Sequence, residues 1–581
     1  MNRRGWLVLG AIALIIAGVL AIILGTSGSG GEIAERTRST GLPLTVEQQS
    51  VDFQTADLSF EVFPDRKAID GKAVLGFAVL KPIDKLQFDL DPNLPITSIF
   101  ADGKALDETA WRNVGGQVTV DLPQPKKAGD RLSLAVAYGG KPHVAVKAPW
   151  DGGFVWSETP EGKPWIATAI QGEGCDMFWP CFDNSLVEIG TVDLHITVPE
   201  GLSAPSNGRL IGTSKAKDGR QTFHWRTHRP NNYAIALNIA PYKSLSAPYK
   251  SRFGNTIPMM FWYLPGEEEK AKRLFTEFAP TLDFFESTVG PYPFGTEKVG
   301  AVLTPHLGME HQTINAYGNE YKPAAEGYDW LFSHEFSHEW FGNQLTNRDW
   351  DDMWLHEGFG SYMQPLFLRW RDGELAYKAA MFKQRQGIAN KFPMVSGHHR
   401  LEHEVYDDKT GPANDIYVKG SWILHTLRGL IGDEPFFRAT RRLVYGRPDP
   451  KPGNFEPRFG STNEFERIAS EEAGRNLKWF FDVYLRHARL PTLVDSRNGS
   501  QLNLQWRTPA GLPFPMPVEL LVDGKLQTVA MDRGKGVVSL PSPTSHVVID
   551  PDGKLLRHSE AMDRYRAFTQ AEAAKKAAAA K

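Results

Sequence analysis

Cysteine is nearly absent from this chain. Only Cys175 and Cys181 occur among 581 residues. Two cysteines are too few for a disulfide framework, and this spacing does not suit a zinc site of their own. An oxidising compartment would permit a bond between them, but two buried free thiols are the interpretation that we favour.

The chain also lacks an excess of positive charge. It has 65 Lys and Arg residues against 68 Asp and Glu residues, which gives a formal net charge of −3. This balance argues against nucleic acid as a partner and against a polybasic membrane surface. A length of 581 residues exceeds what one hydrophobic core usually organises, so we expect roughly three or four structural units.

Residues 6–24 form an uncharged, largely apolar run that follows Arg3 and Arg4. Its nineteen residues approach the roughly 20 needed to cross a bilayer and exceed the 7–15 of a typical signal-peptide core. We therefore expect residues 1–24 to be an uncleaved membrane anchor, with a cleaved signal peptide as the alternative. The positive-inside rule places the remaining chain on the non-cytoplasmic side, periplasmic or extracellular, after a flexible linker at 25–45.

The segment 334–338 reads His-Glu-Phe-Ser-His, and Glu357 follows after eighteen intervening residues. Composition alone predicts only about 0.03 such H-E-x-x-H patterns in the chain. On a helix His334 and His338 project from one face and can bind one ion at roughly 2.0–2.1 Å, with Glu357 as the third ligand. An open fourth position beside Glu335 is typical of a catalytic zinc site with a general base. The segment thus indicates a zinc peptidase.

Periodicity divides the chain into three regions. From about 46 to 248, short alternating segments separated by Gly, Pro, Asn and Asp predict a β domain. From 249 to 490, longer helical periods predict the domain that carries the metal site. Strand patterns return at 491–560 and predict a small β-sandwich, and the polar Ala/Lys-rich tail at 561–581 is expected to be frayed.

The zinc motif and five further stretches together resemble the aminopeptidase N family of gluzincin zinc metallopeptidases. The motif continues as Glu339-Trp340-Phe341-Gly342-Asn343, as in that family. In chain order, the other stretches are Gln171-Gly172-Glu173, Pro180-Cys181-Phe182-Asp183, Leu307-Gly308-Met309-Glu310-His311, Trp354-Leu355-His356-Glu357-Gly358-Phe359 and Tyr417-Val418-Lys419-Gly420. The resemblance spans roughly 45–560. It implies a multidomain α+β fold with an N-terminal β-saddle, a thermolysin-like, mainly helical catalytic domain and a C-terminal β-sandwich.

The resemblance also implies roles for individual residues. One zinc ion per chain would be held by His334, His338 and Glu357. Glu335 would act as the general base, and Tyr417 would donate a hydrogen bond to the oxyanion. Substrate binding would fall to Glu173 and Glu310, which hold the free α-ammonium group of a peptide, and to Gln171, Gly308 and Met309, which line the pocket for the first side chain.

The chain departs from the family pattern at four positions of these stretches. The departures are Leu307 in place of Gly, His311 in place of Asn, Glu339 in place of Gln and His356 in place of Asn. The first two fall on the substrate-binding segment, so they affect the expected side-chain preference more than the reaction. The other two could act as outer groups around zinc or as ordinary hydrogen-bonded residues.

Other interpretations remain open. His398, His399 and His403, with Glu402 and Glu404 among them, could form another metal site, but a polar loop near the cleft is the interpretation we favour. The whole chain is interpreted as a membrane-anchored zinc aminopeptidase that acts on peptides with a free N-terminus. The alternatives are a catalytically weak or inactive family member that binds peptides, and an endopeptidase.

Overall fold

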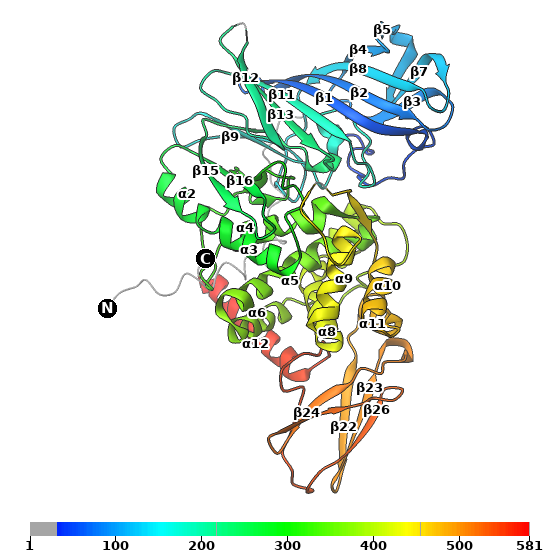
Figure 1. Cartoon of the computed structure of the whole chain (residues 1–581), viewed down its shortest axis with the longest axis vertical. Coiled ribbons are helices and arrows are strands. Elements are labelled where there is room, and N and C mark those ends of the chain that lie inside the picture. The colour runs from blue at the N-terminus through cyan, green and yellow to red at the C-terminus, as the bar shows by residue number, and fades with distance from the viewer. Residues whose placement is uncertain (1–31, 217, 454, 580–581) are drawn as a thin grey trace.

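Figure 1 shows a computed structural model of the chain, which describes residues 32–216, 218–453 and 455–579. A β-rich domain, a mainly helical domain and two small sheets follow one another along the long axis. The predicted anchor at 6–24 lies outside the described residues. Within the described part, none of the helices is both long enough and apolar enough to cross a bilayer.

The N-terminal domain is built on an eight-stranded sheet with the order β12-β13-β11-β1-β2-β8-β4-β5. Alternate residues of its strands are buried, as in β1, where Leu58, Phe60 and Val62 face the core. The smaller sheets β3-β7-β6 and β14-β10-β9 complete the domain. Its strands are β1 Val51–Phe63, β2 Ala68–Val79, β3 Ile83–Asp89, β4 Ile96–Ala101, β5 Lys104–Ala105, β6 Trp111–Val114, β7 Gln117–Lys126, β8 Arg131–Gly140, β9 Gly153–Glu158, β10 Pro164–Ala169, β11 Thr191–Val198, β12 Arg209–Lys215, β13 Gln221–His228 and β14 Asn238–Ile239.

The middle domain combines a five-stranded sheet, β15-β16-β17-β19-β18, with a helical body. The expected boundary at residue 248 falls inside β15, which pairs with β16, so β15 belongs to this second domain. The strands are β15 Lys243–Lys250, β16 Thr256–Tyr263, β17 Val299–Leu303, β18 Gly308–Met309, β19 Asn315–Tyr317, β20 Leu345–Asn347 and β21 Arg458–Gly460. The helices are α2 Glu268–Phe275, α3 Phe278–Thr288, α4 Trp330–Ser337, α5 Trp354–Asp372, α6 Glu374–Arg385, α7 Glu402–Tyr406, α8 Asp415–Ile431, α9 Asp433–Tyr445, α10 Thr462–Glu472 and α11 Lys478–Tyr484.

Two glycines bring helices α5 and α8 into direct contact. A Cβ atom added to Gly420 would lie 2.8 Å from the Cα of Gly358, closer than ordinary van der Waals contact allows. Gly358 follows Glu357 in α5, and Gly420 lies three residues after Tyr417 in α8. The close crossing therefore holds the segments that carry Glu357 and Tyr417 against each other.

The C-terminal region contains two three-stranded sheets, β22-β23-β26 and β25-β24-β27. Their strands are β22 Thr492–Asn498, β23 Gln501–Arg507, β24 Val518–Val522, β25 Lys525–Val529, β26 Lys535–Ser539 and β27 Val547–Ile549. Trp506 and Phe514 belong to the same buried cluster as the catalytic helices, so the two regions share one core. Residues Glu560–Ala579 form helix α12, although the sequence predicted a frayed tail there. This helix lies near α6, and the rings of Phe382 and Tyr565 are 5.6 Å apart.

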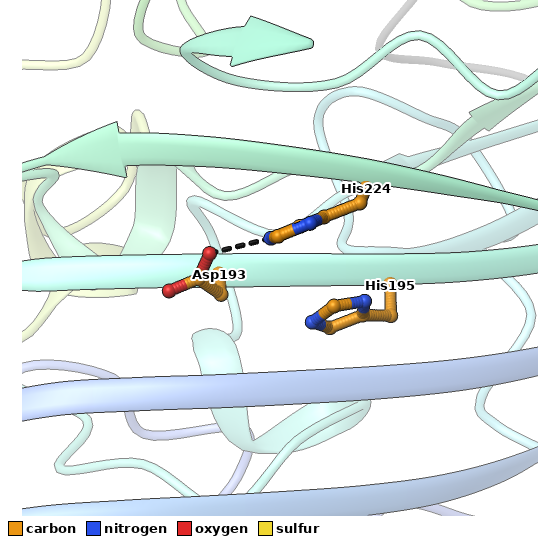
Figure 2. A group of neighbouring side chains, drawn as sticks. All are labelled: Asp193, His195 and His224. Carbon is orange, nitrogen blue, oxygen red and sulfur yellow. Dashed lines mark hydrogen bonds and ion pairs between the residues drawn. The ribbon is translucent and has the colours of Figure 1, made fainter. Parts of the chain in front are cut away.

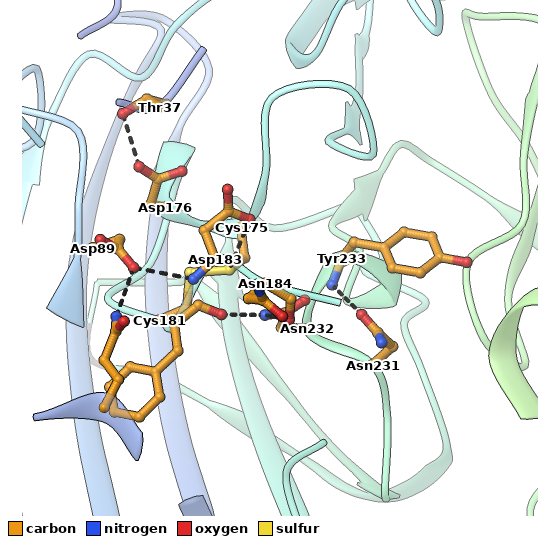
Figure 3. Close-up of a disulfide and its surroundings, with 12 residues drawn as sticks. Thr37, Asp89, Cys175, Asp176, Cys181, Asp183, Asn184, Asn231, Asn232 and Tyr233 are labelled. Atoms are coloured by element: carbon orange, nitrogen blue, oxygen red, sulfur yellow. Dashed lines mark hydrogen bonds between the residues drawn. A yellow bond between two sulfur atoms is a disulfide. The ribbon is translucent and has the colours of Figure 1, made fainter. Parts of the chain in front are cut away.

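Cys175 and Cys181 form a disulfide, so the prediction of free thiols was wrong (Figure 3). The two Cα atoms are 6.2 Å apart, within the range that a disulfide spans. Both residues are fully buried, and the backbone of Cys181 exchanges two hydrogen bonds with Asp89, at 2.7 and 3.1 Å. The turn between the cysteines creates this proximity, which a spacing of six residues alone does not reveal.

Candidate metal centre and active site

Helices α4 and α5 bring His334, His338 and Glu357 together. The Nε2 atoms of the two histidines are 3.3 Å apart, and the Oε2 atom of Glu357 lies 3.4 Å from His334 Nε2 and 3.5 Å from His338 Nε2. Ligands about 2.1 Å from a tetrahedral ion are separated by about 3.4 Å. The three atoms thus form one face of a coordination tetrahedron of the size that zinc requires, and the predicted ligand set is assembled.

The surroundings of these atoms also fit a metal ion. Oε2 of Glu357 is buried and accepts no hydrogen bond, although it points toward both imidazoles. Its other oxygen, Oε1, accepts a hydrogen bond from the hydroxyl of Tyr406 at 3.1 Å, and Nδ1 of His338 lies 2.9 Å from the carbonyl oxygen of Phe341. Outer contacts of this kind orient metal ligands. The donor set and its supports suit a zinc ion.

Glu335 lies beside this centre and is only 7% exposed. Burial raises the pKa of its carboxyl group well above the usual range, and the neighbouring Glu310 adds to the rise. Gly308 of β18 packs directly against it, because a Cβ atom there would lie 2.5 Å from Oε1 of Glu335. Only glycine at this position leaves space for the carboxylate.

Tyr417, near the start of α8, faces the same centre. Its ring centroid is 6.0 Å from that of His334. Burial raises the pKa of the phenol well above its usual value, and the charge of Glu357 raises it further, so the hydroxyl remains a hydrogen-bond donor at neutral pH.

Glu310 follows β18 and is 4% exposed. Its Oε1 atom accepts hydrogen bonds from Nε2 of Gln171 at 2.5 Å and from the hydroxyl of Tyr233 at 3.3 Å. The N-terminal domain therefore contributes Gln171 and Tyr233 to the site, and Met309 is buried beside them.

Glu173 has a different environment. Its carboxylate accepts a hydrogen bond from the backbone amide of Gly152. Burial raises the pKa of Glu173 to about 7 and that of Glu402 to about 8, and the two carboxylates repel each other. In this structure the direct partner of Glu310 is Gln171 rather than Glu173.

Sequence reasoning missed Tyr233 and Tyr406, and it named Glu402 only as a member of a possible further metal site. Tyr233 follows β13, and the other two lie on the short helix α7, where no apolar period announced a helix. In the 398–404 segment, Glu402 is linked electrostatically to Glu173, whose charge raises the pKa of Glu402. His399 pairs with Asp349 at 2.5 Å, and no metal cluster forms from this segment within the described residues.

The structure shows the surroundings of three of the departures from the family pattern. Oε1 of Glu339 accepts hydrogen bonds from the backbone amide of Thr313 and the side-chain amide of Asn315, both at 2.9 Å. Nε2 of His356 accepts from the backbone amide of Asn347 at 3.0 Å. His311 is fully buried. The hydrogen bonds of Glu339 and His356 fasten the strand and loop segments around the site.

A second cluster with metal-ligand residue types lies on the large sheet (Figure 2). His195 and His224 are paired across β11 and β13, and Asp193 lies 2.6 Å from Nε2 of His224. The guanidinium of Arg226 contacts both oxygens of Asp193, at 2.9 and 3.1 Å. Because the positively charged Arg226 already pairs with Asp193, we interpret the cluster as a network of charged side chains on the sheet.

Two family models match this chain. The peptidase M1 N-terminal domain matches residues 53–231, and the peptidase family M1 domain matches residues 319–484, which include all three candidate ligands and Tyr417. The chain belongs to peptidase family M1. The predicted family and its multidomain fold are confirmed.

Curated M1 relatives match most of the chain. Aminopeptidase B of Rattus norvegicus is 25% identical over 78% of this chain and 67% of its own length. Probable aminopeptidase 1 of Saccharolobus solfataricus is 21% identical over 83% of this chain and 60% of its own length. The chain therefore spans about three fifths to two thirds of these relatives.

Solved M1 structures share the fold. The M1 zinc metallopeptidase of Deinococcus radiodurans superposes with a TM-score of 0.62 at 22% identity, over 78% of this chain and 98% of its own. A variant of that enzyme solved with a Tyr-Ser-Ala substrate has a TM-score of 0.62, and a two-domain M1 zinc metallopeptidase variant bound to L-tryptophan has a TM-score of 0.64 at 22% identity. The match to the peptidase family M1 domain makes this chain a peptidase hydrolase, and the solved structures share its fold.

Proposed function

We propose that this chain is a zinc aminopeptidase that removes single residues from the free N-terminus of peptides. The observation that carries the proposal is the triangle of His334, His338 and Glu357, whose edges of 3.3–3.5 Å match a zinc centre and which lies beside Glu335 and Tyr417. One zinc ion bound there would polarise the scissile carbonyl group and make water a better nucleophile.

The residues around this centre have distinct tasks. Glu335 accepts the proton of the attacking water and passes it to the leaving amine, which general base catalysis requires. The Tyr417 hydroxyl donates a hydrogen bond to the oxyanion, and one such donor is typically worth about 2.7–4 kcal/mol.

Glu310 supplies the end recognition. Its buried carboxylate would bind the substrate's α-ammonium group through charge-assisted hydrogen bonds, and an acylated N-terminus would leave it unpaired. The Gln171 amide contacts the same carboxylate and lies at the site, while Gly308 and Met309 form the adjoining wall. Glu173 and Glu402 lie close enough to raise the pKa of Glu402, and a cationic group bound between them would favour the ionised form of both carboxyl groups.

The test is cleavage of one peptide in free and N-acetylated forms by the full chain, with Glu335→Gln as the control. We expect single residues to be released from the free form only, with no release by the control although it still binds zinc. Equal internal cleavage of both forms would establish an endopeptidase. Zinc binding without cleavage would instead favour an inactive, peptide-binding family member.

We further propose that residues 1–24 anchor the enzyme, with the catalytic part on the non-cytoplasmic side. The apolar run at 6–24 and the disulfide between Cys175 and Cys181 support this location, because disulfides persist in oxidising compartments. Recovery of the enzyme in the membrane fraction, with its catalytic part degraded by protease added from the non-cytoplasmic side, is the expected result. Recovery of a soluble chain that lacks residues 1–24 would refute the anchor.

A further inference from the structure

Two adjoining cavities lie between the catalytic helices and the C-terminal segment. Their volumes are about 670 and 270 Å³, and both are lined by Arg385, Ser559 and Met562. The larger one reaches Arg428, which is eleven residues beyond Tyr417 on α8 and thus about 16 Å along the helix. The cavities are therefore separate from the candidate metal centre.

The carboxylates that line these cavities already have partners. Four of them form ion pairs at 2.8 Å: Glu374 with Arg369, Asp433 with Arg428, Asp552 with Lys378, and Asp563 with His558. The fifth, Asp550, accepts hydrogen bonds from the backbone amides of Lys554 and Leu555 at 2.8 and 3.1 Å. The negative charge of the walls is thus largely committed to other groups.

Four arginines of the walls have no such partner. In the described part of the chain, Arg385, Arg489, Arg557 and Arg566 form no ion pair with a carboxylate within 4.0 Å. Nε of Arg566 is buried and has no hydrogen-bond partner there. The two adjoining cavities therefore present several guanidinium groups that have no ion-pair partner.

Arg385 is the most enclosed of the four, with 8% of its surface exposed. Its guanidinium lies 5.3 Å from the ring centroid of Trp422 and donates a hydrogen bond to the carbonyl oxygen of Arg557. Burial, with a contribution from the positive charges of Arg566 and Arg557, lowers its pKa to about 10. Like charges held together in a buried place are costly unless an anion joins them.

We propose that these cavities bind a multiply charged oxyanion, either a phosphate compound or a polycarboxylate, through Arg385, Arg557 and Arg566. Guanidinium groups match both anions because their parallel N–H donors contact two oxygens at once. Arg489, which is exposed, lies at the rim of the smaller cavity. The combined space is large enough for a small metabolite.

The anion would also fasten the C-terminal segment. Arg385 belongs to α6, Arg557 to the segment before α12, and Arg566 to α12 itself. A ligand that contacts all three would bridge these segments and offset the repulsion between their guanidinium groups. We therefore expect the anion to bind saturably and to raise the melting temperature of the protein.

The experiment is a titration of the zinc-loaded full chain with pyrophosphate and, separately, with citrate, by calorimetry at constant ionic strength. We expect saturable binding of at least one anion and a rise in melting temperature. Arg566→Gln should weaken that binding at least tenfold, because a charge-assisted contact is lost. Arg131→Gln, which removes an exposed arginine of β8, is the matched control and should bind as the unmodified chain does.

The two anions distinguish the source of the ligand. Binding of pyrophosphate alone would assign a phosphate compound, binding of citrate alone a polycarboxylate, and binding of both the shared oxyanion chemistry. Circular dichroism and zinc content report folding, and Arg566→Gln keeps every contact of Arg385 described above. The proposal is overturned if neither anion binds saturably, or if Arg566→Gln and Arg131→Gln bind equally well.

Discussion

Replacement of Tyr406 by Phe tests the metal centre through a residue that is not itself a ligand. The hydroxyl of Tyr406 donates to Oε1 of Glu357 at 3.1 Å, while Oε2 faces the two histidines. Glu357 is 4% exposed, so water cannot readily replace the lost donor. Loss of such an outer contact typically weakens metal binding 10- to 100-fold, or about 1.4–2.7 kcal/mol.

The assay is competition for zinc between the protein and a chelator of known affinity. We expect the zinc dissociation constant of Tyr406→Phe to rise by one to two orders of magnitude. Tyr242→Phe is the control, because its hydroxyl donates to the carbonyl oxygen of Leu303 at 2.7 Å and its loss removes a hydrogen bond of similar burial elsewhere. Unchanged zinc affinity in Tyr406→Phe, or an equal loss in the control, would refute the reasoning.

Three further predictions follow from buried contacts. Burial lowers the pKa of His311 to about 3 in the folded protein. Between pH 6.5 and pH 3 the imidazole of His311 is therefore protonated mainly in the unfolded state. The free energy of unfolding falls as the pH falls, by about 2 kcal/mol at pH 5. The urea midpoint of the His311→Asn variant should therefore fall less between pH 7 and pH 5 than that of the unmodified chain. An equal fall in both proteins would contradict this. Gly308→Ala places a methyl group 2.5 Å from Oε1 of Glu335, so we expect kcat to fall with zinc content unchanged, and an undiminished kcat would show that the carboxylate has room to move. Gly420→Ala crowds α8 against Gly358 of α5 and should destabilise the fold by about 1–3 kcal/mol in urea unfolding, with no loss if the helices separate freely.

Much of the metal centre could be predicted because it depends on local spacing. His338 follows His334 by four positions, about one turn of helix, so α4 brings the two imidazoles to one side wherever it packs. The buried alternation of β1 likewise reports a sheet face directly. In contrast, the C-terminal tail has no apolar period that predicts a packed helix, and α12 forms where the sequence predicted a frayed end.

Contacts between distant segments could not be predicted from the sequence. Tyr406 reaches Glu357 across 49 residues, and Gln171 reaches Glu310 across 139, so neither pair leaves a periodic signal in the chain. The disulfide escaped for a related reason, because the turn between its cysteines, rather than their number, brings the sulfur atoms together.

The sequence by itself determined the family, and it predicted the three candidate ligands and the candidate base, since a short motif and its fixed distance to Glu357 indicate their relative positions. Only the tertiary structure decided which side chains surround them. The Gly358–Gly420 contact sets the approach of α5 and α8, and the packing of the N-terminal domain selects Gln171 as the partner of Glu310. Such choices depend on how separate elements pack, because side chains far apart in sequence meet only when the cores around them close.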